Sequence, residues 1–329
     1  MYSNSLKRLG IYFFYDKDGI VDDYVPYYLE QLQKYCSELC VVVNGLLTEK
    51  GRRKLESCSS RLIVRENTGF DAWAYKEALE SYGFIEIAQT FDEVLLNNFT
   101  VYGPIGSFGP MFEKMTSSVC DFWGHCRYFP VENQQVCGMP VPEHLMSYFI
   151  VFKKVIITNN CFEYYFKTLM PIKNYDEARL YHEFRMTDYF ENYGFISDSY
   201  IPYEATKMMK GINTSVSDAY RQFYEYHSPI LKRKALFIKD GREEFSIGFG
   251  NFNSLIHAIY QSKSYDLKLC FNNLIRTGNF DYKKKNINYK KRLKYFILGK
   301  IFMIKRYKRK LNAELDTIDT LLIDKILSG

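Results

Sequence analysis

Short apolar runs alternate with helical patterns along the first part of the chain, and this alternation constrains the fold more than any other feature. The expected strands are Leu9–Tyr15, Leu39–Val43, Leu62–Val64 and Glu93–Leu96. The segments between them have the apolar spacing of helices, at Val21–Cys36, Glu49–Ser57 and Asp71–Tyr82. Strands separated by helices form a mainly parallel sheet covered by helices. We therefore expect an α/β fold with one principal domain.

Two of these strands end in polar residues just before a turn. The strand at Leu62–Val64 leads into a charged turn, and the strand at Glu93–Leu96 ends in a pair of amides and a Gly-Pro turn. The polar residues at the two strand ends are Arg65, Asn67, Gly69, Asp71, Asn97 and Asn98. In an open α/β sheet, ligands bind outside the carboxyl ends of the strands. The sequence thus predicts a site for a small polar ligand where these two ends meet.

Each strand end also has a structural explanation. Asp71 can cap a helix that begins at Ala72, with Asn67 and Gly69 forming the turn before it. Asparagines such as Asn97 are common in turns of any kind. In the functional interpretation, Arg65 and Asn67 bind the ribose or phosphate of a nucleotide, while the helix N-terminus faces an anion. The residues alone leave both explanations open.

The pattern changes after residue 120. Expected strands at Asp121–Cys126 and Ser147–Val155 flank a loop at 127–142, and an apolar segment lies at Ala235–Lys239. Further helices are expected at Cys161–Leu169, Asp176–Tyr193 and Ser254–Leu274. The second of these contains His182 and Glu183, which are consecutive and so should not share one face of an α-helix.

Cysteine spacing and charge limit the possible partners. None of the eight cysteines forms a C-x-x-C pair or a zinc-binding pattern, so we expect them to be reduced, buried and cytosolic. Residues 283–310 carry thirteen Lys or Arg and no acidic residue, whereas acidic residues outnumber basic ones in the rest of the chain. The apolar block within this tail is ten residues long, too short to cross a bilayer, which needs about twenty.

The tail is therefore expected to lie on an anionic membrane surface as an interfacial anchor. A buried terminal helix in an oligomer contact is the alternative. Nucleic-acid binding by the tail is not expected, because the body of the protein is acidic.

Six segments, in order from about Tyr12 to Phe237, resemble the rhamnan synthesis protein F family of bacterial polysaccharide assembly. They read YDKDGIVDDYVPYYL, RENTGFDAWAYK, FDEVLLNNFTVYGPIG, DFWGHC, HLMSYFIVFKK and SPILKRKALF. The resemblance implies a glycosyltransferase of the nucleotide-diphosphosugar transferase (GT-A) class at the cytoplasmic face of the membrane. The implied reaction transfers L-rhamnose, or a related sugar, from dTDP-rhamnose onto a growing, lipid-linked glycan. Many members also carry a second transferase region, which this chain lacks.

The resemblance assigns roles to residues. GT-A enzymes bind a divalent metal through an Asp-x-Asp motif, but here the equivalent strand end reads Leu96–Asn97–Asn98, without a carboxylate. Either Asp71 helps to hold Mg²⁺ or Mn²⁺, or no metal is held and Arg65, Lys76 and helix N-termini bind the diphosphate. The implied donor-binding residues are Tyr15, Arg65, Asn67, Gly69, Asp71, Asn97 and Asn98.

Glu183 falls on the acidic pair that supplies the general base in this class, and Asp121 is the second candidate. Trp123, His144 and Tyr148 are expected on the acceptor side. One base is enough if a β-linked donor gives an α-linked product, because the reaction then inverts. The alternatives are a transferase for another nucleotide sugar, such as a UDP-hexose, and a non-catalytic component of a glycan-assembly complex.

The expected division of the chain is a GT-A-like domain at 1–245, a helical extension at 246–282 and the basic, membrane-associating tail at 283–329.

Overall fold

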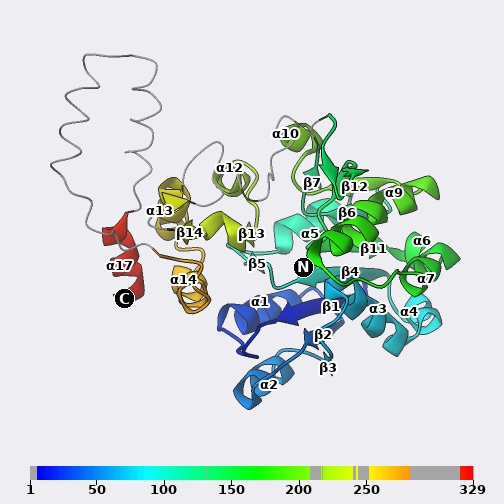
Figure 1. Ribbon diagram of the computed structural model, residues 1–329, viewed down its shortest axis with the longest axis horizontal. Helices are drawn as coiled ribbons and strands as arrows, with labels where there is room; N and C mark the ends of the chain where they lie inside the picture. The colour runs from blue at the N-terminus through cyan, green and yellow to red at the C-terminus, as the bar shows by residue number, and fades with distance from the viewer. Residues whose placement is uncertain are drawn as a thin grey trace.

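The fold is built on a seven-stranded sheet, seen near the centre of Figure 1. The computed structural model describes residues 6–130, 132–207, 216, 218–239, 242–243, 252–281 and 319–328. In spatial order the strands are β12 (Ser197–Ser199), β6 (Phe122–Gly124), β11 (Phe149–Lys153), β4 (Glu93–Asn98), β1 (Arg8–Tyr15), β2 (Glu38–Asn44) and β3 (Arg61–Arg65). β11 runs antiparallel to both of its neighbours, and the other pairs are parallel. The predicted α/β class, with a mostly parallel sheet flanked by helices, is confirmed.

Two hydrophobic cores lie on the two faces of this sheet, because successive side chains of a strand point to opposite faces. In β4, Leu95 belongs to one core and Leu96 to the other. The first core includes α1 (Tyr24–Gln33), α2 (Glu49–Glu56), α5 (Gly109–Thr116), α10 (Tyr203–Lys207), α12 (Ala219–Tyr224), α13 (Phe252–Ser262), α14 (Leu267–Arg276) and α17 (Thr320–Ser328). The second includes α3 (Phe70–Tyr82), α4 (Phe84–Thr90), α6 (Lys154–Ile157), α7 (Asn160–Lys167), α8 (Tyr175–Ala178) and α9 (Phe184–Asn192).

Short strand pairs extend the loops around the sheet. They are β5 (Val101–Tyr102) with β13 (Leu231–Lys232), β7 (Arg127–Tyr128) with β10 (His144–Leu145), β8 (Gln135–Val136) with β9 (Met139–Pro140), and β14 (Ile238–Lys239) with β15 (Arg242–Glu243). The β5–β13 pair brings the segment around residue 232 against the turn that follows β4. A single turn of 3₁₀-helix, η2 (Arg233–Leu236), continues from β13.

Three predicted helix features differ in the structure. The expected helix Asp176–Tyr193 is interrupted by a π-helical segment, η1 (Arg179–Glu183), between α8 and α9. The expected helix Ser254–Leu274 is two helices, because Asp266 caps a new start at α14 by accepting a bond from the amide of Lys268. The capping position of α3 is Gly69, with a φ of +67°, so the structural explanation in which Asp71 caps a helix starting at Ala72 is wrong.

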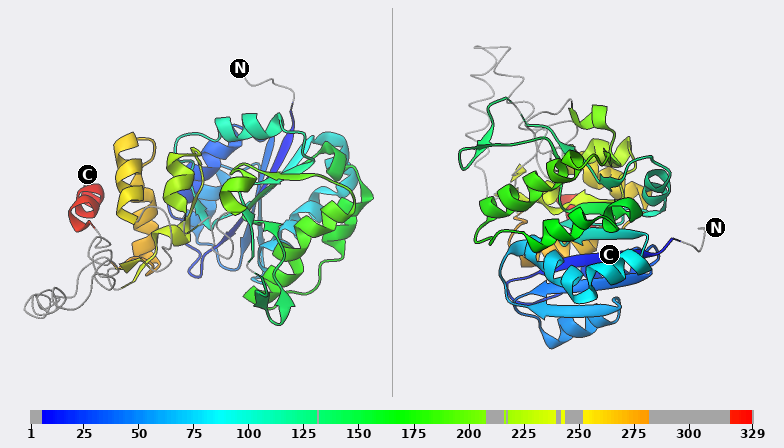
Figure 2. Two further views of the ribbon diagram at one scale, coloured as in Figure 1. Left: turned by 90° about the horizontal axis from the view of Figure 1, so that it is seen from above. Right: turned by 90° about the vertical axis from the view of Figure 1, so that its right-hand side faces the viewer.

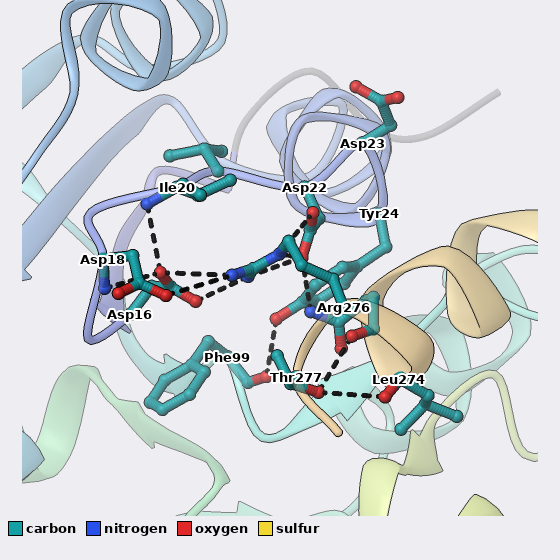
Figure 3. A network of polar contacts seen from close by, with 12 residues as sticks. Asp16, Asp18, Ile20, Asp22, Asp23, Tyr24, Phe99, Leu274, Arg276 and Thr277 are labelled. Carbon is teal, nitrogen blue, oxygen red and sulfur yellow. Dashed lines mark hydrogen bonds and ion pairs between the residues drawn. The ribbon is translucent and has the colours of Figure 1, made fainter. Parts of the chain in front are cut away.

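An ionic cluster joins the C-terminal helices to the loop that follows β1 (Figure 3). Arg276, at the end of α14, contacts Asp16 at 2.5 Å and Asp22 at 2.8 Å. Asn273, one turn earlier, donates to the Asp22 carboxylate at 2.5 Å. The helices α13, α14 and α17 lie together at one end of the molecule, opposite α6 and α7, in both Figure 1 and Figure 2. The proposed domain division at residue 246 stays a prediction.

All eight cysteines are unpaired, and most are buried as predicted, but Cys137 is exposed. The basic tail at 283–310 lies outside the described residues, so its expected membrane contact stays a prediction. Within the described ranges, no helix is both long enough and apolar enough to cross a membrane.

Candidate functional site

A cavity of about 960 Å³ lies at the carboxyl ends of β1 and β4. Most of its lining comes from six segments that are far apart in sequence, and Tyr128 is also part of it. They are the end of β1 (Phe13 and Tyr15), the turn 67–71, the segment 98–100 at the end of β4, and residues from 144–148, 172–184 and 232–237. This is the position that the sequence predicts for a ligand in an open α/β sheet.

A series of hydrogen bonds links residues that line the cavity. The Asn98 amide donates to the Asp71 carboxylate at 2.9 Å. The Thr100 hydroxyl donates to the Asn98 carbonyl oxygen at 2.6 Å, and the Lys232 ammonium donates to the Thr100 hydroxyl at 2.7 Å. The two predicted strand ends are therefore joined side chain to side chain, and a lysine from the second half of the chain completes the series.

The turn before α3 depends on its glycine. Gly69 has a φ of +67°, and a Cβ there would lie 2.2 Å from Cγ of Trp73, so only glycine fits. Arg65 braces the turn from outside the cavity, donating to the carbonyl of Thr68 at 2.8 Å and to Glu77 at 2.6 Å. These contacts hold Asp71 at the start of the helix, facing Asn98.

Glu183 enters the cavity from η1 and is held on both sides. The Ser147 hydroxyl donates to its carboxylate at 2.6 Å, and Nε2 of His144 lies 3.8 Å away. Burial alone would raise the pKa of the Glu183 carboxyl, but contacts with His144, Ser147 and nearby Lys232 outweigh it and lower this pKa to about 2. Glu183 is therefore an anion at neutral pH.

His182, the residue before Glu183, also lines the cavity. Its Nδ1 lies 3.1 Å from the hydroxyl of Tyr165, whereas its buried Nε2 has no hydrogen-bond partner in the described part of the chain. Burial lowers the pKa of His182, which favours the neutral imidazole. His182 and Glu183 are consecutive, yet both line the cavity, and both lie in the π-helical segment η1, where the expected α-helical spacing does not hold.

Three consecutive basic residues, Lys232, Arg233 and Lys234, form another wall. Lys232 lies 4.0 Å from the centre of the Tyr148 ring. Burial lowers the pKa of Lys232 to about 8, although nearby Glu183 acts in the opposite direction. No role was predicted for these residues, and the available signal was a basic triplet inside the otherwise apolar segment SPILKRKALF.

The structure brings together most of the predicted site residues. Those that line the cavity are Tyr15, Asn67, Gly69, Asp71, Asn98, His144, Tyr148 and Glu183. Tyr148 also has its hydroxyl 2.6 Å from Nδ1 of the buried His125.

Five other predicted residues are not part of the cavity lining. Arg65 is held by Glu77, and Lys76 donates to the carbonyl of Lys167 at 3.1 Å. Asn97 points to the opposite face of β4 from Asn98 and donates to the carbonyl of Ile11 at 3.2 Å. The remaining two are Asp121, which accepts a bond from the amide of Ile196 at 2.8 Å, and Trp123, which is buried against Phe112 and Phe149.

The donor set of the cavity does not fit a divalent cation. Within the described ranges, two carboxylates line it: Asp71, whose oxygens accept from Ala72 and Asn98, and Glu183, held by Ser147 and His144. The lining cations are Lys173, Arg179, Lys232, Arg233 and Lys234. Among the residues that the structure describes, no three His, Cys, Asp or Glu side chains are grouped to hold a metal ion. Mg²⁺ prefers carboxylate and phosphate oxygens, and this cavity offers mostly positive charge.

Comparison with known proteins gives one family match. The family model described as rhamnan synthesis protein F matches residues 39–315, well over half of the chain. No curated protein matches the chain.

Several solved structures show a remote likeness in fold. A 4-diphosphocytidyl-2C-methyl-D-erythritol synthase from Anaerococcus prevotii has 10% identity and a TM-score of 0.38, over 59% of this chain and 87% of that one. Glucosyl-3-phosphoglycerate synthase from Mycobacterium tuberculosis, in complex with Mn²⁺, UDP and phosphoglyceric acid, has 10% identity and a TM-score of 0.31, over 46% and 57%. Core-mannan synthase A from Aspergillus fumigatus, in a Mn/GDP form, has 7% identity and a TM-score of 0.31, over 61% and 72%. Likenesses this remote do not identify a ligand for this chain.

Proposed function

We infer the activity of this chain from its family, because the chain belongs to the rhamnan synthesis protein F family. That membership supports a nucleotide-sugar glycosyltransferase of polysaccharide synthesis. We propose specifically that the protein transfers L-rhamnose from dTDP-rhamnose to a growing, lipid-linked glycan. The observation that carries the proposal is one cavity in which an anionic carboxylate, Glu183, faces a cationic wall at the carboxyl ends of β1 and β4.

Glycosyl transfer needs both kinds of group. As the sugar leaves its diphosphate, the anomeric carbon becomes positive and the departing phosphate oxygen becomes more negative. Fixed positive groups stabilise that oxygen, and a base removes the proton of the acceptor hydroxyl. Asp71, Asn98 and Tyr15 are the proposed donor contacts, while His144, which contacts Glu183, and Tyr148 are on the proposed acceptor side.

Glu183 is the proposed base. A carboxylate with a pKa of about 2 is ionised but only weakly basic. Because the neighbouring Lys232 contributes to that low value, a bound diphosphate that neutralises Lys232 would raise the pKa of Glu183. The base would then strengthen when the donor is present, and an acceptor hydroxyl could be activated in the complete complex.

Glu183→Gln tests this role. We expect transfer or donor hydrolysis to fall by about a hundredfold to ten-thousandfold, as when a general base is removed, with donor binding retained. The measurement is turnover with dTDP-rhamnose and with a panel of UDP- and GDP-hexoses, together with calorimetric binding of each donor. Glu143→Gln is the matched control, since Glu143 pairs with Arg127 at 3.1 Å and is not part of the cavity lining.

Three results would count against the proposal. Unchanged turnover in Glu183→Gln would remove Glu183 from its role. Turnover with a UDP-hexose alone would replace the proposed sugar. Donor binding without hydrolysis or transfer in the wild-type protein, with lipid-linked acceptors supplied, would favour a non-catalytic component of a glycan-assembly complex.

Membrane association is a separate part of the proposal. We expect the basic segment 283–310 to hold the protein on anionic lipid at the inner face of the cell membrane.

A further inference from the structure

We propose that Lys232 and Arg233 form the subsite for the donor diphosphate, and that this subsite binds the diphosphate without a divalent metal ion. The inference rests on the proposed function and names the residues that would carry its leaving group. It starts from the poor fit between the cavity and a metal ion: cations dominate the lining, and both lining carboxylates are already engaged.

Lys232 is placed to accept a new partner. An ammonium group has three N–H donors. One is given to the Thr100 hydroxyl at 2.7 Å, and the face of the Tyr148 ring lies 4.0 Å away. In the described part of the chain, Thr100 is the one hydrogen-bond acceptor that Lys232 reaches. An oxygen-rich anion in the cavity would therefore meet unused donors on a half-buried cation.

Arg233 supplies an independent observation. Its Nη1 is anchored by the Tyr24 hydroxyl at 3.3 Å and the Phe99 carbonyl at 3.4 Å. Its buried Nε has no acceptor among the described residues, although the residue lines the cavity. A buried donor left without a partner is unfavourable, and the guanidinium that carries it lines the cavity, where its fixed positive charge faces a bound phosphate.

The position of the pair relative to the predicted donor contacts fits a diphosphate. The Asn98–Thr100–Lys232 series of hydrogen bonds links Lys232 to Asp71 and the end of β4. A nucleotide held at the strand ends would then direct its phosphates toward β13 and η2. Two fixed cations there stabilise the charge that develops on the leaving oxygen, which is the task that a metal ion performs in metal-dependent transferases.

The test is binding of dTDP, UDP and GDP to the full-length protein by calorimetry, first in EDTA and then with Mg²⁺. We expect the preferred nucleotide to bind in EDTA, with little change on adding Mg²⁺. Lys232→Met should weaken that binding by about tenfold to a hundredfold, the range for losing a charged hydrogen bond, while the corresponding nucleoside is affected much less. Lys232→Arg, which keeps the charge, should retain most of the affinity.

Lys114→Met is the matched control. Lys114 also makes one hydrogen bond, to the carbonyl of Tyr200 at 2.9 Å, and also lies over a tyrosine ring, at 5.0 Å, but it is not part of the cavity lining. Its substitution should leave nucleotide binding unchanged. Circular dichroism of each variant separates loss of the fold from loss of the subsite.

Either of two results would overturn this inference while leaving the proposed function intact. One is nucleotide binding to the wild-type protein that EDTA abolishes and Mg²⁺ restores, a result that requires no variant. The other is a folded Lys232→Met variant that binds the nucleoside diphosphate as tightly as the wild type. If none of the three nucleotides binds with or without Mg²⁺, the proposed function fails as well.

Discussion

At the scale of single residues, the cavity contains charged side chains that are partly or fully removed from water, and burial favours the neutral form of such a side chain. Lys232 loses solvation, and burial lowers its pKa to about 8. Glu183 keeps its charge because His144, Ser147 and Lys232 compensate for its burial. In the absence of ligand, the lysine is therefore less stable as a cation than a lysine in water. An anionic ligand would stabilise the charged form of Lys232. Nucleotide binding is therefore linked to the protonation of this side chain.

This link predicts that nucleoside diphosphate binding weakens as pH rises. With a pKa of about 8, Lys232 is mostly charged at pH 7 and mostly neutral at pH 9, so affinity should fall by about tenfold over that interval. The other titratable or charged groups that face Lys232 are Asp71, His125, Cys126, Tyr148, Glu183 and Lys234. Burial lowers the pKa of His125 to about 3, and that of Glu183 is about 2, so neither changes charge between pH 7 and pH 9.

Calorimetric titrations at several pH values between 7 and 9 measure the effect. The Lys232→Met variant should show no such fall, because its side chain does not titrate. A decrease of the same size in the variant would assign the pH dependence to another group.

The sequence identifies some of these residues but not all of them. Asp71 and Asn98 could be predicted as site residues because they are polar and follow strand ends. Glu183 could be predicted because it falls on a motif of the family. Lys232 could not, since its importance comes from its contact with Thr100, a residue far away along the chain. The same reasoning put Asn97 in the site, but the alternation of side chains along β4 turns it away while Asn98 faces Asp71.

At the scale of secondary-structure elements, the two ends of β1 and β4 have different roles. The carboxyl ends of β1 and β4 hold the cavity, while their amino ends are joined by a buried ion pair. Arg8 of β1 contacts Glu93 of β4 at 2.5 Å, and their side chains are 4% and 3% exposed. Arg8 also lies over the ring of Phe112, at 4.1 Å, so the pair ties α5 to the sheet as well.

Glu93→Ala should therefore destabilise the protein by about 3–5 kcal/mol, because it leaves the buried Arg8 without its partner. The free energy of unfolding in urea, followed by circular dichroism, measures the change. The double substitution Arg8→Met and Glu93→Leu is the control. It should cost much less, since apolar residues of similar size can replace a buried pair. A single variant as stable as the wild type would contradict a structural role for the pair.

Most elements follow from periodicity, and the exceptions have local causes. The strands of the first half lie within a residue or two of their predicted positions because apolar runs between turn residues are a strong signal. The π-helical segment η1 was not predicted, because its residues carry the same helical spacing as α8 and α9. It is also the element that brings both His182 and Glu183 to the cavity. Here the part of the fold that the sequence does not reveal lies at the candidate site.

At the scale of the whole molecule, the C-terminal helices are part of the same packed structure as the first strand. Arg276 of α14 contacts Asp16 and Asp22 in the loop after β1 (Figure 3). Tyr15, the last residue of β1, lines the cavity. The loop also leads into α1, where the hydroxyl of Tyr24 contacts Arg233. The C-terminal helix α14 is thus joined to the loop and the helix that adjoin the proposed donor site.

The cluster predicts sensitivity to acid. Burial alone would raise the pKa of Asp16, but hydrogen bonds from Arg276 and from the amides of Ile20 and Asp18 lower it in the folded state. Its stabilising effect is therefore present above the unfolded pKa of about 4 and is lost as pH falls below it. Arg276→Met should remove part of this effect, on the order of 1 kcal/mol after screening by solvent, at pH 7 and much less at pH 3.

Urea unfolding of the wild type and the variant at both pH values measures this difference. Arg221→Met is the control, because Arg221 of α12 makes a local ion pair at 2.7 Å with Glu225, the residue that follows this helix. An equal loss at pH 7 and pH 3 would show that Arg276 contributes by packing and not through the carboxylates.

Long-range contacts of this kind could not be predicted from the sequence. Arg276 and Asp16 are separated by 260 positions, and nothing local marks them as partners. The helical pattern around residues 254–274 was visible, but not the surface it packs on.

The placement of Lys232 also has a consequence for synthesis of the protein. A ribosome completes all seven strands of the sheet and the turn at Gly69 before it reaches β13, so an unfinished chain can contain every strand of the sheet and neither cation of the proposed diphosphate subsite. Nascent chains and fragments that stop short of residue 232 would then leave the cellular pool of activated sugar untouched, and the capacity to capture it would appear only in the nearly finished polypeptide.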